Sequence, residues 1–378
     1  MEILPKYDVA VVGGGLAGLA AAILLRQRGY NVILFEKEAY PFHKVCGEYI
    51  SLESWNFLLS LGLPLAEWNL PQIKTLQITA PNGRLFFTTL PLGGFGISRY
   101  LLDSKLAAIA ESIGVHLLEK TKVEEVERGE TFHVRFRQQQ IEAKLCLAAF
   151  GKRSNLDVKW NRSFLQQQDK RLNNYIGVKY HLKTDWPQQT IGLHNFENGY
   201  CGISHIEDEK VCFCYLTRAE NLKRNGNSLQ QMEKTVLFQN PHLKNIFMTS
   251  EVVQEFPVTI SQISFSQKTK VENGILMLGD TAGMITPLCG NGMSIALHTA
   301  KIAASLADEF LQDKRSHRSL EQAYQQQWQQ QFALRLRTGR LLQRFFGRSG
   351  ISNLFVDSFR RMPFLAGPVI RLTHGKPF

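Results

Sequence analysis

The sequence has few cysteines, and their positions do not suggest a shared site. Six cysteines are scattered over 378 residues, without a CxxC pair or a histidine at the spacing of a zinc site. This pattern argues against a disulfide scaffold and against a structural metal, and it favours a reducing compartment. We therefore predict no metal site.

Long hydrophobic runs, internal repeats and long low-complexity tracts are also absent from the sequence. The longest apolar run, DVAVVGGGLAGLAAAILL at residues 8–25, is interrupted by glycines and followed at once by a second strand pattern. It has no basic leader and no cleavage site, so we interpret it as neither a signal peptide nor a membrane span. We expect a cytoplasmic protein of roughly two domains.

Acidic residues are scarce toward the C-terminus. The chain carries a formal net charge of +11, and residues 331–378 contain nine Lys or Arg against one acid, Asp357. Nucleic acid is a poor match, because the basic residues are confined to this region and no RNA-binding motif accompanies them. Two interpretations stay open: a peripheral contact with an anionic membrane, or helices that pack on the preceding domain with solvated arginines.

The start of this basic region has the pattern of a two-sided helix, with arginines on one side and large apolar residues on the other. Such a helix suits either interpretation, because its apolar side can face lipid or protein. The basic side comprises Arg337, Arg340, Arg344 and Arg348, and the apolar side comprises Phe332, Leu336, Leu342 and Phe346.

Residues 7–38 alternate as a strand, a glycine turn, a helix and a second strand, which predicts one βαβ unit. Gly13, Gly15 and Gly18 occupy the G-x-G-x-x-G positions, and Glu36 closes the second strand. These glycines allow a tight turn, the approach of a pyrophosphate and close helix packing, while the acid suits a ribose hydroxyl. The pattern favours a dinucleotide over an empty glycine turn. Further candidate cofactor-binding residues are Leu16, Ala17 and Lys37.

A second glycine-rich segment lies far downstream, where GILMLGDTAGMITPLCGNGMSIAL (274–297) predicts a buried strand, an irregular loop and a helix from about Met293. Together the two segments resemble the FAD proteins of the p-hydroxybenzoate hydroxylase and geranylgeranyl reductase superfamily. The resemblance implies that Asp280 binds the ribityl chain of FAD and that PLCGNGM (287–293) runs beside the pyrimidine edge of the flavin. Bare amides at a helix N-terminus would stabilise the anionic reduced ring. The candidate cofactor-binding residues of this loop are Pro287, Gly290, Asn291, Gly292 and Met293, and Gly290 and Asn291 are also candidate catalytic residues.

Two more segments resemble the same superfamily. PFHKVCGEYIS (41–51) is similar to the loop that passes near the flavin ring, which makes Cys46 and Gly47 candidate cofactor contacts. Cys46 is also a candidate catalytic thiol, with a small buried residue as the alternative. ISRYLLDSKLAAIAESIGV (97–115) is similar to an arginine-containing helix start, so the resemblance implies that Arg99 contacts the ribityl chain or the pyrophosphate and that Asp103 caps or orients it. A surface ion pair is the alternative for Arg99.

The sequence also departs from its relatives. Hydroxylases of the superfamily carry an acid before glycine near residue 150, whereas AAFGKRS (148–154) has Phe150 there. The WxWxIP motif of tryptophan halogenases is absent, so we do not expect halogenation. A second G-x-G-x-x-G is absent as well, so NAD(P)H would dock transiently rather than occupy a domain of its own.

We predict an α/β fold with a Rossmann-like FAD-binding domain, an inserted antiparallel β-sheet substrate domain and a helical C-terminal region. The FAD-binding domain would comprise residues 1–70, 98–157 and 265–312, the substrate domain 71–97 and 158–264, and the basic helical region 313–378. Asn82-Gly83 predicts a hairpin within the substrate domain. Candidate residues lining the substrate pocket are Tyr180, His194, Tyr200, Cys201, His205, Phe213 and Tyr215.

Three functions fit these observations. The first is an FAD-dependent reductase of a hydrophobic, isoprenoid or polyketide-like substrate, with NAD(P)H as transient reductant. The second is an FAD-dependent monooxygenase that hydroxylates an aromatic substrate. The third is a lipid escort protein on the same fold without catalysis. The reductase should turn over without oxygen, the hydroxylase should not, and the escort protein should lack flavin absorbance.

Overall fold

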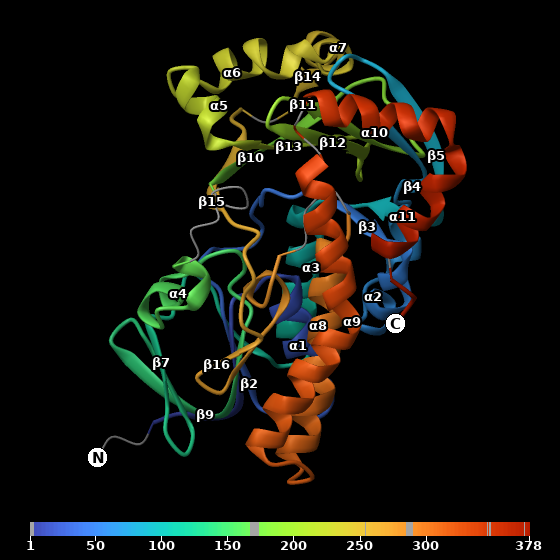
Figure 1. Cartoon of the computed structure of the whole chain (residues 1–378). Coiled ribbons are helices and arrows are strands. Elements are labelled where there is room, and N and C mark those ends of the chain that lie inside the picture. The colour runs from blue at the N-terminus through green and yellow to red at the C-terminus, as the bar shows by residue number, and fades with distance from the viewer. Residues whose placement is uncertain are drawn as a thin grey trace.

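The computed structural model describes residues 4–166, 174–253, 255–284, 290–345, 347, 349–373 and 375–378. It has a lower part built on a mainly parallel sheet and an upper part built on a mainly antiparallel sheet (Figure 1). The α/β fold class is confirmed. Among the described residues, no helix has both the length and the hydrophobicity needed to cross a membrane.

The lower sheet has the strand order β16-β17-β9-β1-β2-β6. Strands β17, β9, β1, β2 and β6 are parallel, as a βαβ unit with crossover helices requires. Helices α1, α3 and α8 cover this sheet, and α1 packs directly against α3 and α8. The strands are β1 (Lys6–Val12), β2 (Val32–Phe35), β6 (His116–Leu118), β7 (Glu125–Arg128), β8 (Phe132–Phe136), β9 (Gln139–Ala148), β16 (Val271–Glu272) and β17 (Ile275–Met277). The helices are α1 (Leu16–Gln27), α2 (Trp55–Ser60), α3 (Arg99–Ser112), α4 (Asn155–Lys159) and α8 (Gly292–Leu311).

The upper sheet has the strand order β14-β10-β13-β12-β11-β4-β5-β3, with β15 also paired to β10. Gly83 lies in the turn between β4 and β5 at a φ of +83°, so the predicted hairpin is confirmed. The strands are β3 (Tyr49–Ser51), β4 (Gln72–Thr79), β5 (Leu85–Gly96), β10 (Tyr175–Lys183), β11 (Thr190–Phe196), β12 (Gly199–His205), β13 (Val211–Arg218), β14 (Glu251–Val252) and β15 (Val258–Ile263).

Helices cover both faces of the upper sheet. The first group, α5 (Ala219–Arg224), α6 (Leu229–Thr235) and α7 (Pro241–Thr249), packs on one face. The second group, α10 (Ser349–Arg361) and α11 (Ala366–Thr373), packs on the other face with a short 3-10 turn η7 (Pro363–Leu365) between them. These two groups give the sheet two separate apolar cores.

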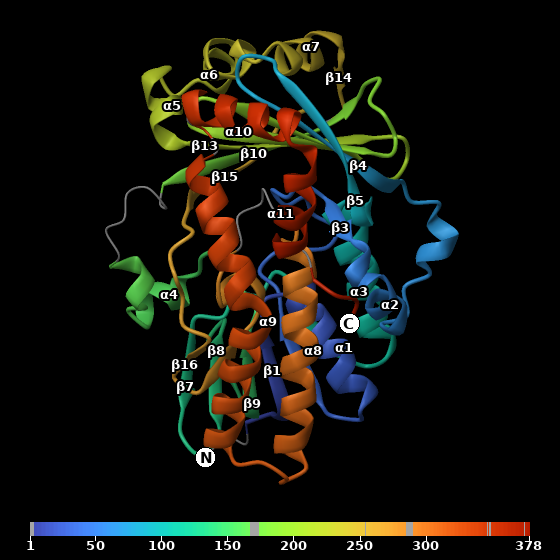
Figure 2. The same ribbon diagram turned by 45° about the vertical axis from the view of Figure 1, so that its right-hand side comes forward.

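A long helix, α9 (His317–Phe345), lies beside α8 and leads up to α10 (Figure 2). Phe332 and Leu336, on the predicted apolar side of this helix, are buried in the core of the lower part. The Tyr324 hydroxyl donates a hydrogen bond of 2.6 Å to the Met277 carbonyl and anchors α9 to β17. This stretch therefore faces protein, as the packing interpretation expected. Phe346 and Arg348 lie outside the described residues.

Candidate functional site

The two glycine-rich segments of the sequence meet at the carboxyl ends of the parallel strands. Gly279, after β17, adopts a φ of +55°, and a Cβ placed there would lie 3.4 Å from the Cβ of Ala17 on α1 and 3.2 Å from that of Ala296 on α8. The Thr281 hydroxyl accepts a hydrogen bond of 2.8 Å from the Gly151 amide, which follows β9. In open α/β sheets this edge is where ligands bind. The fold thus brings together loops from three neighbouring strands.

The first turn of α1 is a cradle that side chains would fill. A Cβ at Gly18 would lie 1.9 Å from the Gly13 carbonyl oxygen, and Gly13 has a φ of +107°. At Gly15, by contrast, the described atoms nearest to a Cβ would be those of the Arg99 guanidinium at 3.8 Å and the Lys44 ammonium at 3.9 Å. Bare helix amides beside two cations are suited to a pyrophosphate. We call residues 13–18 with Lys44 and Arg99 the α1 mouth, and its composition fits the diphosphate of FAD.

The cations of the α1 mouth are held by one buried carboxylate. Arg99 donates two hydrogen bonds of 2.7 Å to Asp103, and Lys44 donates one of 3.0 Å. Burial alone would raise the pKa of Asp103, but Arg99 and Lys44 hold it below its ordinary value. Asp103 therefore orients the arginine, as the resemblance implied, and the pair is buried rather than a surface ion pair. Lys44 was missed from the sequence, although it stands within the segment that named Cys46 and Gly47.

The acid at the end of β2 is buried and bound to backbone. Glu36 accepts a hydrogen bond of 2.9 Å from the Gly14 amide and one of 3.0 Å from the Glu38 amide. Its carboxylate therefore lies against the glycine turn, where a ribose hydroxyl would have to reach it. Lys37 is exposed, and its ammonium lies 3.7 Å from the carboxylate of Glu38 rather than at the Glu36 carboxylate. Tyr40, which the sequence did not single out, donates its hydroxyl to the Gly14 carbonyl.

The turn that carries Asp280 is fixed by a buried lysine. Lys268 donates a hydrogen bond of 2.9 Å to the Asp280 carbonyl and one of 2.8 Å to the Lys152 carbonyl. Burial lowers the pKa of Lys268 to about 8. On the other side, the Thr299 hydroxyl accepts a hydrogen bond of 2.9 Å from the Gly279 amide. Asp280 is thus placed by its backbone, and within the described part of the chain its half-buried carboxylate forms no hydrogen bond or ion pair that would compete with the ribityl chain that the resemblance implies.

The candidate residues before α8 lie close to β3. A Cβ at Gly290 would lie 3.0 Å from the ring of Tyr49, so only glycine lets the loop pass this ring. Asn291 is buried and donates a hydrogen bond of 2.5 Å to the Thr373 carbonyl of α11, which links this loop to the C-terminal helices. Gly292 and Met293 form the first turn of α8. Pro287 lies outside the described residues.

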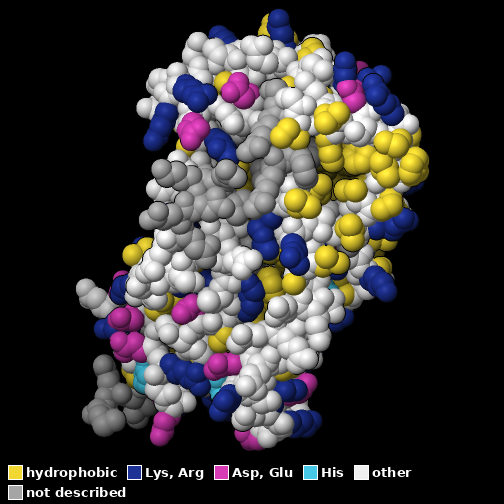
Figure 3. Space-filling view, in the orientation of Figure 1, with side chains coloured by type: hydrophobic (Ala, Val, Ile, Leu, Met, Phe, Trp, Pro, Cys, Tyr) yellow, Lys and Arg dark blue, Asp and Glu magenta, His cyan; other side chains and the backbone are white. Residues whose placement is uncertain are grey.

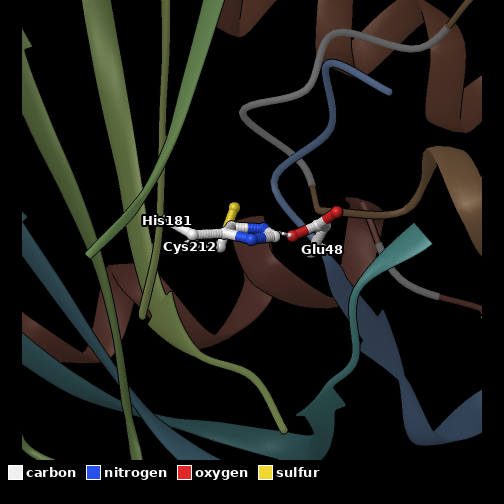
Figure 4. A group of neighbouring side chains, drawn as sticks. All are labelled: Glu48, His181 and Cys212. Atoms are coloured by element: carbon white, nitrogen blue, oxygen red, sulfur yellow. Dashed lines mark hydrogen bonds and ion pairs between the residues drawn. The ribbon is translucent and has the colours of Figure 1, made fainter. Parts of the chain in front are cut away.

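The Cys46 loop contacts the upper sheet through a buried polar network (Figure 4). Glu48 accepts hydrogen bonds of 2.7 Å from Lys179, 2.6 Å from His181 and 2.9 Å from the Arg99 amide. Burial alone would raise the pKa of Glu48, but His181 and Lys179 hold it below its ordinary value. The sequence did not point to this network, because Lys179 and His181 are 131 and 133 residues away from Glu48.

Cys212 is the third potential metal ligand near Glu48 and His181. Its thiol donates a hydrogen bond of 3.3 Å to the Cys46 carbonyl, and the Glu48 carboxylate is already bound by a lysine ammonium. We therefore interpret the cluster as an ion-pair network that joins the two parts of the molecule. Cys46 is half-buried, and among the described residues no atom lies within 4 Å of a Cβ placed on Gly47.

An apolar cavity begins next to Gly290 and Tyr49. It has a volume of about 90 Å³, opens to solvent, and lies between the upper sheet and helices α9, α10 and α11. A pocket of this composition suits the apolar part of a small molecule. Besides Gly290 and Tyr49, its lining residues are Leu76, Ile78, Phe86, Thr88, Leu90, Ile191, Leu193, Leu342, Phe355, Phe359, Ala366, Val369, Ile370 and Thr373.

None of the seven residues predicted to line the substrate pocket lines this cavity. The strand side of the cavity wall comes from β3, β4, β5 and β11, and of these strands only β11 carries one of the seven, His194. Cys201, Phe213 and Tyr215 instead pack in the core beneath α5, α6 and α7. His194 and His205 are buried and hydrogen-bonded to Thr79 and to the Trp186 carbonyl. The sequence pattern of a strand shows that its side chains alternate between the two faces of the sheet, but it does not show which face borders a cavity.

Comparisons with known proteins agree with this geometry. A family model described as "FAD binding domain" matches residues 6–333. Digeranylgeranylglycerophospholipid reductase 2 of Methanopyrus kandleri is 25% identical over 342 residues, covering 86% of this chain and 83% of that protein.

Two solved structures have the same fold. A geranylgeranyl bacteriochlorophyll reductase-like protein of Thermoplasma acidophilum superposes with a TM-score of 0.76 at 19% identity, covering 98% of this chain and 92% of that one. The flavin-dependent brominase Bmp2 superposes with a TM-score of 0.79 at 19% identity, covering 97% and 93%. These neighbours establish the fold and leave the reaction to be argued from the site.

Proposed function

Because the chain belongs to the FAD-binding domain family and is an FAD-dependent oxidoreductase, we propose that it reduces carbon–carbon double bonds in a hydrophobic, isoprenoid-like lipid. NAD(P)H is the proposed reductant. The apolar cavity carries this proposal, because its wall is almost entirely hydrocarbon and it ends at Gly290 and Tyr49. The names of the Methanopyrus and Thermoplasma proteins support the substrate class.

The chain's own residues would hold the cofactor and shape its surroundings. FAD supplies the hydride chemistry when bound. The α1 mouth would bind its diphosphate, Glu36 its ribose and Asp280 its ribityl chain. The backbone at Gly290 and Asn291 would lie along the ring edge, where bare amides favour negative charge. The network around Glu48 would keep the Cys46 loop fixed against the upper sheet.

Reduction of a double bond also requires a proton for the second carbon, and Tyr49 is our candidate donor. It lines the apolar cavity and lies against Gly290. Its hydroxyl is buried and has no hydrogen-bond partner among the described residues. Burial, together with the nearby Glu53, raises the pKa of Tyr49 well above its ordinary value. The hydroxyl is therefore protonated at neutral pH, as an ordinary tyrosine also is, and the raised pKa makes it a weaker acid, so the case for Tyr49 rests on its position in the cavity.

Anaerobic turnover tests the proposal directly. Holoenzyme, NAD(P)H and a polyprenyl lipid should consume NAD(P)H without oxygen and yield a product heavier by two hydrogen atoms per reduced bond, as read by mass spectrometry. Tyr49→Phe should keep bound FAD and its reduction by NAD(P)H but slow lipid reduction about 100-fold, the usual contribution of a general acid. Turnover that requires oxygen would instead support a monooxygenase. Purified protein without flavin absorbance would support the lipid escort function.

A further inference from the structure

The outer sides of α10, η7 and α11 form an exposed apolar patch. Phe364 is 72% exposed and Leu354 is 69% exposed, which is unusual for large apolar side chains gathered in one place. Figure 3 shows hydrophobic side chains gathered over this edge of the molecule, with Lys and Arg around them. We call the set the outer patch. It comprises Leu354, Met362, Phe364, Leu365 and Leu372.

The helices that carry the outer patch are apolar on their inner sides as well. Phe359 of α10 lines the apolar cavity and packs on Phe86 of β5 with ring centroids 5.5 Å apart. Val369 and Ile370 of α11 line the same cavity. A surface helix needs one apolar face to pack on its protein, and a second apolar face calls for a second apolar neighbour. Intramolecular packing therefore accounts for the inner sides only.

The surroundings of the outer patch are basic. Arg360, Arg361 and Arg371 are exposed on the same helices. The one acid of the region, Asp357, is paired with Arg84 and lies 3.8 Å from Arg360. Neither Arg361 nor Arg371 forms an ion pair with another of the residues that the structure describes. The partner of this surface must therefore be apolar at its centre and negatively charged at its rim.

We propose that the outer patch docks onto the surface of an anionic lipid bilayer. Phe364 and Leu365, in the 3-10 turn between the two helices, enter the acyl boundary, and Arg361 and Arg371 face the headgroups. A bilayer supplies both chemistries at once, whereas a protein partner would need a matched apolar groove with an acidic rim. The cavity lies under these same helices, so docking places its wall next to the lipid phase. This inference concerns where the protein binds and does not require the proposed reaction.

Vesicle sedimentation tests the docking. Holoenzyme should sediment with phosphatidylglycerol-containing vesicles and only weakly with pure phosphatidylcholine. The double variant Phe364→Ser/Leu365→Ser should bind anionic vesicles at least ~10-fold more weakly, given the apolar area removed. Arg361→Glu/Arg371→Glu should lose at least ~25-fold on anionic vesicles, about fivefold for each basic residue, and little on phosphatidylcholine.

Matched control variants test whether vesicle binding depends on the outer patch rather than on any exposed apolar or charged side chain. Phe256 is also 72% exposed but precedes β15, at the opposite end of the upper sheet from β5, so Phe256→Ser should bind vesicles like the wild type. Lys314→Glu, at the turn between α8 and α9, is the control for charge. Flavin content should be unchanged in every variant, which keeps this test apart from that of the proposed function.

Three results would overturn the docking proposal. The first is sedimentation of the Phe364→Ser/Leu365→Ser variant at the wild-type level, and the second is a wild-type protein that does not sediment with anionic vesicles. The third is a wild-type dimer in sedimentation velocity that becomes a monomer in this variant, since the outer patch would then be an interface between two copies of the chain.

Discussion

The α1 mouth and the apolar cavity lie in one molecule and recognise ligands by opposite means. The α1 mouth is built from backbone amides and from two cations held by Asp103, so its chemistry depends on missing side chains. The cavity is built mainly from side chains of four strands and three helices, so its chemistry depends on their volume. The difference predicts that the α1 mouth tolerates almost no added atoms, whereas the cavity tolerates apolar exchange and responds mainly to size.

Gly15→Val should have the largest effect. The backbone at Gly15 is extended, with φ −82° and ψ −176°, so valine fits the chain without strain. Its side chain would instead project between Lys44 and Arg99 and displace a diphosphate. Loss of two or three charge-assisted hydrogen bonds of about 1.5–3 kcal/mol each should weaken FAD binding at least ~100-fold. Flavin absorbance per protein and titration of the flavin-free protein measure this.

Gly129→Val is the control for this prediction, because Gly129 is exposed and a Cβ there would approach only the Thr131 carbonyl, at 3.8 Å. Both variants should unfold within about 0.5 kcal/mol of the wild type without flavin. Full flavin occupancy in Gly15→Val would show that the α1 mouth is not part of the FAD site, and the contrast with the cavity would then not hold.

The same contrast explains what the sequence could predict. The glycine spacing of residues 13–18 and the Gly279-Asp280 turn are local patterns with one backbone interpretation, so the βαβ unit and the start of α8 could be expected from them. The hairpin at Asn82-Gly83 is local in the same way. Lys44 could have been found too, since it stands within the segment 41–51 already singled out, but its distance to Gly15 depends on the fold.

The cavity and the Glu48 network could not be predicted by these means. The pairing of β11 with β4 is parallel and joins strands more than 110 residues apart, and it decides which side chains share a face. The docking of α10 and α11 then decides which face encloses a cavity. Alternation along a strand is symmetrical between its two faces, so Leu193 on β11 and Cys201 on β12 look equally suited to a pocket.

Glu48→Gln should have the next largest effect. It tests whether the lower and upper parts of the molecule, which carry the α1 mouth and the cavity, unfold as one cooperative unit. The substitution leaves the Lys179 ammonium buried without its charge partner. Breaking a buried pair in this way costs about 3–5 kcal/mol, which denaturant unfolding measures. Glu38→Gln is the matched control, because Glu38 is half-exposed and lies 3.7 Å from Lys37, where a surface pair contributes at most about 1 kcal/mol.

The difference in the free energy of unfolding between wild type and Glu48→Gln should depend on pH, and the pKa of Glu48 fixes the direction. The pKa of Glu48 is lowered in the folded protein, so its contribution is complete above the ordinary glutamate pKa of about 4.3 and is lost as the pH falls through the lower folded-state value. The gap between wild type and Glu48→Gln should therefore shrink in acid. A gap independent of pH would mean that packing, rather than charge, accounts for the loss. Replacing Lys179 as well, in Glu48→Gln/Lys179→Met, should restore part of the stability.

Ile78→Trp should have the smallest effect. It tests whether filling the cavity slows lipid turnover without changing flavin binding at the α1 mouth. Ile78 of β4 lines the cavity on the wall opposite α10, so a larger ring there would occupy volume that a substrate chain needs. Apolar pockets discriminate by about 1–3 kcal/mol per misfit, so lipid turnover should fall roughly tenfold or more. Flavin content and flavin reduction by NAD(P)H should stay at wild-type values, because Ile78 lies outside the α1 mouth.

Val158→Trp, at a position 57% exposed on α4, controls for the added tryptophan. If the tryptophan at Ile78 disturbs folding, Leu193→Phe on β11 adds less volume to the same wall and should give the same pattern in weaker form. Equal losses of flavin and of lipid turnover in both variants would mean that the cavity and the α1 mouth respond as one site.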